Sequence, residues 1–263
     1  MSRLRGHFYN TRPLDRAASL TARLRAADWQ VTELPLLELV PLALAGSDLQ
    51  ALQQLAYFPT VVVVVSPTAA TLGLSALQQL GLVPTRLAVR WLAVGEGTAQ
   101  VLRAAGIDAD LPAESSSEGL MATALLAGLE SQDRVMVWRG IGGRELVQER
   151  LLARGVQLQV LNLYQRQMPK TSQQLWVSYG FSDKLALDVK KNDSSRPTVV
   201  LLSSGESWRH WQKLAAEHAL DPWLLVLGPR LMDELQCVTT RVKAITSLQP
   251  EHILTALTEI ENT

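Results

Sequence analysis

The stretches Val61-Val-Val-Val-Val-Ser66 and Val199-Val-Leu-Leu-Ser203 decide the fold of this chain. Each is a short, continuous apolar run that ends at a serine, with no polar residue on either face of an extended chain. Such runs are typical of strands that are buried on both sides, as in parallel sheets covered by helices. The sequence therefore predicts an α/β protein with parallel sheets flanked by helices.

The segments around these two runs alternate between short apolar stretches and longer amphipathic ones. This alternation predicts parallel strands joined by crossover helices. Strands are expected at residues 7–10, 31–36, 60–65, 91–94, 134–138, 156–164, 199–202, 223–227 and 241–244. Helices are expected at residues 14–27, 68–80, 97–105, 118–129 and 144–154 and after each of the late strands. Residues 190–197 are polar and predict a solvated loop.

A weak internal repeat occurs in a permuted order. The segments 61–66, 91–95 and 123–125 follow the same order as 199–203, 223–228 and 255–257. A further unit (strand, arginine-bearing turn, helix, strand) comes last in the middle copy but first in the other, at the start of the chain. The order predicts two similar domains, the first of them discontinuous and split around the second. Domain 1 is expected over residues 1–37 plus 170–263, domain 2 over 47–160, and an antiparallel two-stranded linker over 38–46 and 161–169.

Composition excludes several classes of protein. The 263 residues carry 25 Lys and Arg and 25 Asp and Glu, and a formal net charge of zero argues against a nucleic-acid-binding surface. The single cysteine, Cys237, allows no internal disulfide, which fits a reducing compartment, and we expect it in the core. The first ten residues lack the apolar region of a signal peptide, and the longest apolar run is too short to span a membrane. We therefore expect a cytoplasmic protein without membrane contact.

Candidate binding residues lie in six short polar turns, each directly after an expected strand. Ligands of parallel α/β domains bind beyond the carboxyl ends of the strands, where free N–H groups are available. Any one of these turns could serve only to cap a helix or to permit a tight bend. Six at the same sheet edges favour an anion-rich ligand held by N–H and hydroxyl donors. The predicted binding residues are Thr11, Arg12, Ser66, Thr98, Arg139, Gly142, Ser203, Ser204 and Arg230.

Established catalytic and cofactor motifs do not occur. The glycine-rich turns lack the spacing of a dinucleotide fingerprint, no P-loop is present, and the four histidines lack metal-ligand spacing. Tyr164 falls at the second expected crossing between the domains, where a phenol could donate a proton in the space between them. The alternative is a tyrosine that packs in the linker with its hydroxyl in water.

Several short motifs together resemble the uroporphyrinogen-III synthase family, in the family's order and over nearly the whole chain. They are Thr11-Arg12-Pro13, Leu34-Pro35-Leu36 with Glu38, Ser66, Ala93-Val94-Gly95-Glu96-Gly97-Thr98-Ala99 with Gly106, Pro112, Ser116-Ser117-Glu118-Gly119-Leu120, Arg139-Gly140, Gly143-Arg144, Arg154-Gly155, Tyr164-Gln165-Arg166 and Ser203-Ser204-Gly205-Glu206. The resemblance implies two α/β domains joined by a two-stranded linker. One departure is Gly228-Pro229-Arg230, which stands where the middle domain has Thr98.

The resemblance also implies a function. The family's substrate is hydroxymethylbilane, a linear tetrapyrrole with eight carboxylates. Loss of its hydroxyl as water gives an azafulvene, and a spiro intermediate then leads to uroporphyrinogen III with the terminal ring inverted. The resemblance implies a monomeric lyase of heme biosynthesis with no cofactor or metal, acting in the interdomain cleft, with Tyr164 as the catalytic candidate and transient contact with hydroxymethylbilane synthase.

Two other interpretations remain open on the residues alone. One is a non-catalytic cytoplasmic two-domain binder or sensor of an anionic metabolite, with a hinged cleft. The other is a doubly wound enzyme that uses a nucleotide or sugar phosphate, which the missing fingerprints disfavour.

Overall fold

The computed structural model describes residues 4–58, 60–142, 144–178 and 196–263, and most of the expected polar loop (190–195) lies outside them. The chain forms two compact units. Unit 1 comprises Met1–Glu38 and Gln167–Thr263, and unit 2 comprises Leu39–Arg166. Each is a parallel α/β domain, as the sequence predicts.

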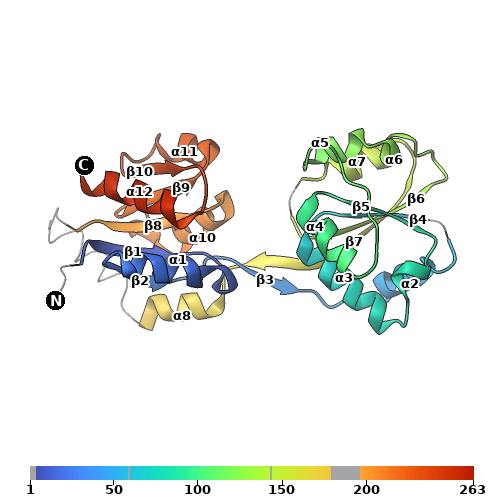
Figure 1. Ribbon diagram of the computed structural model, residues 1–263, viewed down its shortest axis with the longest axis horizontal. Coiled ribbons are helices and arrows are strands. Elements are labelled where there is room, and N and C mark those ends of the chain that lie inside the picture. Colours follow the sequence, from blue (N-terminus) through green and yellow to red (C-terminus); the bar gives the residue numbers. More distant parts are fainter. Residues whose placement is uncertain (1–3, 59, 143, 179–195) are drawn as a thin grey trace. The chain divides into compact units, whose positions relative to one another are not determined.

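Unit 1 is built on a five-stranded parallel sheet in the order β10-β9-β8-β1-β2. Its elements are β1 (Gly6–Asn10), α1 (Leu14–Ala26), β2 (Trp29–Glu33), α8 (Lys170–Ser178), β8 (Thr198–Leu202), α10 (Gly205–Ala215), a 3-10 turn (Ala216–His218), β9 (Trp223–Leu227), α11 (Pro229–Leu235), β10 (Val242–Ile245) and α12 (Pro250–Glu261). Strand β1 lies between β2, which follows it closely in sequence, and β8, which comes from the C-terminal part of the chain. Phe8 is in register with both Val31 of β2 and Val199 of β8. Figure 1 shows the blue N-terminal strands beside the orange and red C-terminal ones.

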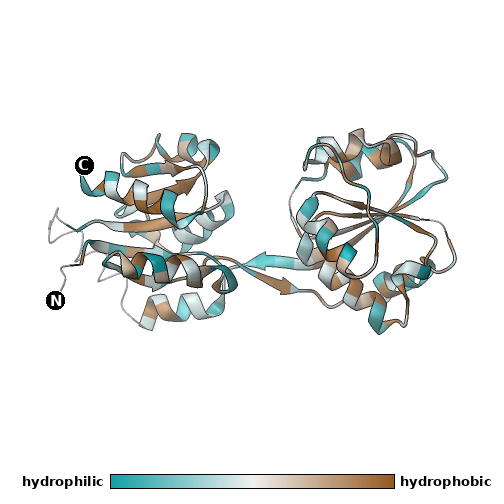
Figure 2. Ribbon diagram, in the orientation of Figure 1, coloured by the Kyte–Doolittle hydropathy of each residue, from teal (hydrophilic) through white to brown (hydrophobic). Residues whose placement is uncertain are grey.

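The sheet of unit 1 is covered on both faces. Phe8, Val199 and Leu225 pack against α1 and α12, whereas Tyr9 and Val200 pack against α8, α10 and α11. Every residue of β8 is buried, which explains why that strand carries no polar alternation. Figure 2 shows the consequence, with apolar strands enclosed by helices that turn polar sides outward.

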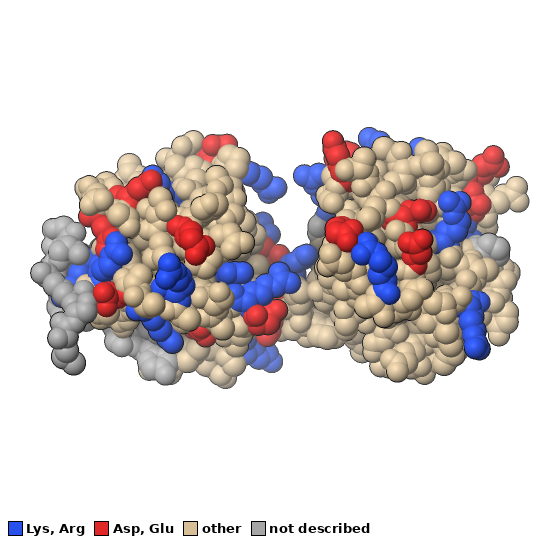
Figure 3. Space-filling view, in the orientation of Figure 1, with Lys and Arg blue, Asp and Glu red and all other residues tan. Residues whose placement is uncertain are grey.

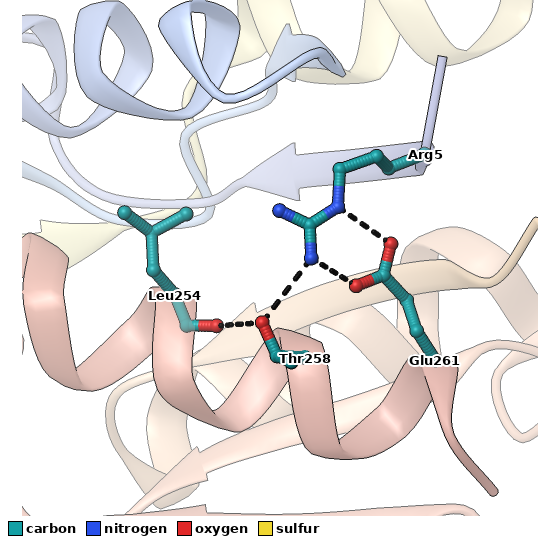
Figure 4. Close-up of polar contacts among 4 residues, drawn as sticks. All are labelled: Arg5, Leu254, Thr258 and Glu261. Atoms are coloured by element: carbon teal, nitrogen blue, oxygen red, sulfur yellow. Dashed lines mark hydrogen bonds and ion pairs between the residues drawn. The ribbon is translucent and has the colours of Figure 1, made fainter. Parts of the chain in front are cut away.

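An ion pair ties the start of the chain to its last helix. Arg5 Nε donates to a carboxylate oxygen of Glu261 (2.8 Å), a second guanidinium nitrogen contacts the other oxygen, and the same nitrogen donates to Thr258 Oγ1 (3.2 Å). Thr258 Oγ1 in turn donates to the Leu254 carbonyl (3.1 Å), so all these partners lie on α12 (Figure 4). The hydrogen bond with Glu261 is the main reason why the pKa of Arg5 is raised, although partial burial opposes it.

Unit 2 has a five-stranded sheet in the order β3-β7-β6-β4-β5. Its elements are β3 (Glu38–Pro41), α2 (Gly46–Gln54), β4 (Thr60–Val64), α3 (Pro67–Gln79), a 3-10 turn (Pro84–Arg86), β5 (Val89–Ala93), α4 (Glu96–Ala104), α5 (Ser117–Ala122), α6 (Ala124–Ala127), β6 (Arg134–Gly140), α7 (Leu146–Ala153) and β7 (Gln157–Gln167). Strands β4 to β7 are parallel. Helices α3 and α4 cover one face of this sheet, and α5, α6 and α7 cover the other.

Strands β3 and β7 carry the chain across the boundary between the units. The Leu42 N–H donates to the Leu163 carbonyl (2.9 Å), and Gln167 donates its amide to Glu38 (2.8 Å). Numbers rise along one strand as they fall along the other, so the two strands run antiparallel. The predicted antiparallel two-stranded element is therefore present, although β3 is short and α2 begins at Gly46.

The two units share one strand order. Unit 2 has β7-β6-β4-β5 where unit 1 has β2-β1-β8-β9. Strand β4 thus corresponds to β8, and β6 to β1, which is the permuted order that the repeat predicts. In unit 1 the pair β8 and β9 follows β1 and β2 in the chain, with unit 2 inserted between β2 and β8. In unit 2 the equivalent pair, β4 and β5, precedes β6 and β7.

Two expectations were wrong. The helix expected over 118–129 is broken at Thr123, which is extended (ψ 142°) and caps α6 by accepting from the Leu126 N–H (3.3 Å). Cys237 is exposed, not in the core, because α11 ends at Leu235 and the cysteine lies in the turn beyond it. Within the described residues, no helix is both long and apolar enough to cross a membrane.

Candidate functional site

The strand order identifies one place in each unit where a ligand can reach the sheet. In unit 2, α3 follows β4 onto one face, whereas α7 follows β6 onto the other. Because the two helices leave in opposite directions, the carboxyl ends of β4 and β6 have a crevice between them, and α/β proteins bind ligands at such points. The corresponding place in unit 1 lies between β1 and β8.

Ser66 and Tyr164 meet at this point in unit 2. Ser66 follows β4 and caps α3 by accepting a hydrogen bond from the Ala69 N–H (3.1 Å). Its Oγ also lies 3.1 Å from the hydroxyl oxygen of Tyr164, which comes from β7. The Tyr164 side chain is only 3% exposed, and the guanidinium of Arg166 lies 5.6 Å from the centre of its ring.

A β-bulge in β7 determines which side of the sheet the Tyr164 side chain lies on. Arg139 of β6 is in register with Asn162 of β7, but Gly140 is in register with Tyr164, so Leu163 is the extra residue. As a result, Leu163 and Tyr164, which are consecutive, both lie in the same hydrophobic cluster. A Cβ on Gly140 would lie 2.4 to 2.8 Å from the Tyr164 ring, so only glycine permits this packing.

A cavity of about 430 Å³ opens beside Tyr164 within unit 2 and is called the unit-2 cavity below. Its lining residues include Arg139, Arg144 and Arg166, together with Tyr164 and Gln148. A larger cavity, about 670 Å³, runs from the edge strand β5 to α5 and α6, away from the ends of β4 and β6. The position of the smaller cavity at the crevice makes it the candidate site.

Arg139 is almost fully buried, with 6% of its surface exposed. Its Nε donates to the Gly140 carbonyl (3.1 Å), and a terminal nitrogen donates to the Gly142 carbonyl. When the Gln148 amide is oriented with its oxygen toward Arg139, it accepts a further hydrogen bond and donates to the Glu145 carbonyl (3.1 Å). Arg139 thus holds the turn after β6 in shape, with Gly142 in the left-handed conformation (φ 79°).

In unit 1 the predicted residues gather at the equivalent place. Thr11 is buried, and its hydroxyl donates to the Leu201 carbonyl, which links β1 to β8. Arg12 lies next to it, half-buried, and burial followed by repulsion from Arg16 lowers the pKa of its guanidinium. An arginine still carries its charge after such a shift, so Arg12 is a cation beside the end of β1.

The remaining predicted residues of unit 1 follow β8 and β9. Ser203 and Ser204 are half-buried, and Ser204 caps α10 by accepting from the Ser207 N–H (3.1 Å). Arg230 is exposed on the short helix α11, after Gly228. In unit 2, the predicted binding residue Thr98 lies on the inner side of α4 after β5. It is buried, with 2% of its surface exposed.

Among the described residues, no group of three or more His, Cys, Asp or Glu side chains could hold a metal ion. The face of the molecule in Figure 3 carries basic and acidic side chains interspersed, without a broad basic surface. Arginines occur at the turns after β1 (Arg12) and β6 (Arg144).

The sequence was also compared with known proteins. A sequence model for the family described as "Uroporphyrinogen-III synthase HemD" matches residues 18–249. The chain belongs to the uroporphyrinogen-III synthase family. The family resemblance predicted from the short motifs is therefore confirmed.

Individual members of the uroporphyrinogen-III synthase family are similar in sequence or fold. The uroporphyrinogen-III synthase of Salmonella typhimurium is 34% identical over 161 residues, which is 59% of this chain and 63% of that protein, so the match spans less than two thirds of it. A mutant uroporphyrinogen III synthase from the extremely thermophilic bacterium Thermus thermophilus has a TM-score of 0.66 at 13% identity, with 98% of this chain and 99% of that one covered. The enzyme of Helicobacter pylori gives 0.50 at 15% identity, covering 97% and 100%. The solved structures confirm the predicted fold.

Among the charged residues that line the unit-2 cavity of this family member, sequence reasoning missed Arg144 and Arg166. Both occur in the motifs quoted for the resemblance; Arg144 closes the polar turn after β6 but was not chosen as a binding residue, and Arg166 lies within a strand, which the turn argument does not cover. Arg139 and Arg144 lie at the two ends of one glycine-rich turn, and this spacing of two arginines could have indicated an anion-binding turn.

Proposed function

We propose that this protein is a cyclising lyase that converts hydroxymethylbilane to uroporphyrinogen III with inversion of the terminal ring and loss of water. The observation that carries the proposal is the family match over residues 18–249. The site supports it because a substrate with eight carboxylates suits turns rich in N–H, hydroxyl and guanidinium donors.

We propose Tyr164 as the proton donor to the leaving hydroxyl. The C–O bond breaks with its electron pair on oxygen, the phenol proton turns the departing hydroxide into water, and the pyrrole nitrogen's electron pair stabilises the remaining carbon as an azafulvenium cation (the protonated azafulvene), whose charge balances that of the phenolate. Ser66 Oγ already accepts from the Ala69 N–H, so it can donate its own proton to the Tyr164 oxygen. The phenol proton is then free for the substrate, and the phenolate that forms keeps a hydrogen-bond donor.

The substrate is proposed to bind in the cleft between the two domains. What supports this is that each unit carries its own set of donor-bearing turns after its strands: Thr11, Arg12, Ser203, Ser204 and Arg230 in one, Ser66, Thr98, Arg139 and Gly142 in the other. Holding both ends of the linear tetrapyrrole would favour closure through the spiro intermediate over unguided closure without inversion. No cofactor enters these steps.

We further propose a cytoplasmic monomer that takes hydroxymethylbilane directly from hydroxymethylbilane synthase through transient contact. The tendency of the substrate to close without inversion favours rapid transfer.

The test is to supply freshly made hydroxymethylbilane and to separate the cyclised isomers. The expected result is type III isomer at a rate far above spontaneous closure. Type I isomer alone, at the spontaneous rate, would reject the catalytic role. Tight binding of uroporphyrin without any acceleration would instead favour the alternative of a non-catalytic binder or sensor of an anionic metabolite.

A further inference from the structure

The unit-2 cavity contains a positive charge that its protein surroundings do not neutralise. Arg139 is buried, and its hydrogen-bond partners are the Gly140 and Gly142 carbonyls and the Gln148 amide, all of them neutral. Across the described part of the chain, no carboxylate forms an ion pair with it. A buried cation without a counter-ion is costly, so the cavity favours an anionic occupant.

Two further arginines of the same lining are free to move toward such an occupant. Arg144 is exposed and meets Glu118 only at long distances, 3.4 and 3.5 Å, which a better acceptor can displace. Arg166 is exposed and lies over the Tyr164 ring. Exposed, long ion pairs contribute little to stability, so exchanging Glu118 for a ligand carboxylate costs little.

We propose that the unit-2 cavity is a subsite for a single pyrrole ring of the substrate, with Arg144 and Arg166 each binding one of that ring's two carboxylate arms. The inference rests on the proposed function, since eight carboxylates on four rings give two per ring. The cavity volume of about 430 Å³ lies at the small end of ligand sites, which span about 300–1,000 Å³. It suits one substituted ring and not a whole tetrapyrrole, and the buried charge of Arg139 supplies a fixed attraction for the dianionic ring.

Glu118 then competes with the ligand carboxylate for Arg144. Removing its charge frees Arg144, so Glu118→Gln strengthens ligand binding, whereas Arg144→Gln weakens it. A purely structural role of the Arg144–Glu118 pair would make the two changes act in the same direction.

The probe is a monopyrrole that carries one acetate and one propionate arm, titrated into the full-length protein by calorimetry. We expect wild type to bind it, its dimethyl ester not to bind, and Arg144→Gln and Arg166→Gln each to weaken binding about tenfold or more, the effect of losing one charge-assisted contact. Glu118→Gln is expected to tighten binding about twofold or more. Arg150→Gln is the matched control, because Arg150 is exposed on α7 and outside the cavity lining, and it should leave binding unchanged.

The same variants are then assayed with hydroxymethylbilane, where KM should rise for Arg144→Gln and Arg166→Gln with the thermal midpoint unchanged. Equal binding of diacid and ester, absence of binding, or wild-type affinity in both arginine variants would overturn the subsite. Failure of wild type to form type III isomer would reject the proposed function separately, because the calorimetric titration needs no turnover.

Discussion

Tyr164 is contacted from three sides, and each contact comes from a different part of unit 2. The Ser66 hydroxyl meets its oxygen, Gly140 leaves space for its ring, and Arg166 lies over the ring face. The bulge at Leu163 turns the ring onto the side of the sheet where Ser66 lies. A single phenol oxygen is thereby held at the crevice between β4 and β6.

Replacing Tyr164 by Phe removes the proposed proton donor while the ring still fills its place. Turnover is expected to fall by about 10²-fold or more, since general acid catalysis contributes that much. Loss of one hydrogen bond should cost only about 1 kcal/mol of unfolding free energy. Type III isomer formation and a thermal melt measure the two effects. Tyr57→Phe, at a tyrosine that is 78% exposed, is the control, and an unchanged rate in Tyr164→Phe would remove the residue from catalysis.

Gly140→Ala tests whether turnover depends on the position of the Tyr164 ring. The new methyl would enter the space of the Tyr164 ring, so we expect the ring to be displaced, turnover to fall and stability to drop by about 1–3 kcal/mol. Urea unfolding and the isomer assay give the measurements. Gly46→Ala is the matched control because a Cβ there meets nothing within 4 Å. Wild-type turnover in Gly140→Ala would show that the ring position is not critical.

At the scale of elements, helix α3 determines where Ser66 sits. The helix packs its small residues on the sheet, and Gly73 faces the ring of Trp138 from β6. Sequence alone located α3 and its serine cap, because Ser-Pro at the end of an apolar run is a strong helix start. It did not locate the break at Thr123, because the apolar pattern of 118–129 continues through it and only the tertiary position of α6 reveals the turn.

Gly73→Ala sets helix propensity against packing. Alanine favours the helix by about 1 kcal/mol, but its methyl would lie within 2.2 to 2.7 Å of the Trp138 ring. The clash with a fully buried indole should win, giving a net loss of about 1–2 kcal/mol in chemical unfolding. A more stable variant would mean that α3 can shift away from the sheet at little cost.

At the scale of the whole molecule, unit 1 depends on both ends of the chain. Strand β1 provides the partner for β8, and the Arg5–Glu261 pair closes the unit at its edge (Figure 4). Unit 2 is continuous between them. The two units therefore differ in how they can fold, although their strand orders match.

Arg5→Gln removes the ion pair that joins the N-terminal segment to α12. Because the Arg5 side chain is about one-third exposed (36%), solvent screens the pair, and we expect a loss of about 0.5–1 kcal/mol in unfolding free energy. The difference from wild type should shrink at high salt. Arg16→Gln, at a more exposed pair with Asp15, is the control and should be neutral. A salt-independent loss would point to packing instead.

Residues 39–166, produced alone, are expected to fold, because they contain the whole of unit 2 and both of its core clusters. Residues 167–263 alone are not expected to fold. They lack β1, β2 and α1, so one edge of β8 has no partner strand and the apolar residues that α1 covers are exposed to water. Circular dichroism and urea titration of the two fragments provide the measurement. Cooperative unfolding of 167–263 by itself would contradict this dependence.

The sequence by itself determined the parallel sheets, most strand and helix positions, and the splitting of one domain around the other. These features follow from local apolar runs and the order of a repeat, which are properties of the chain read in one dimension. Tertiary structure alone decided the bulge at Leu163, the meeting of Ser66 and Tyr164 across 98 residues, and the exposure of Cys237. Register and packing depend on which residues lie opposite one another on neighbouring strands, and no local pattern records that.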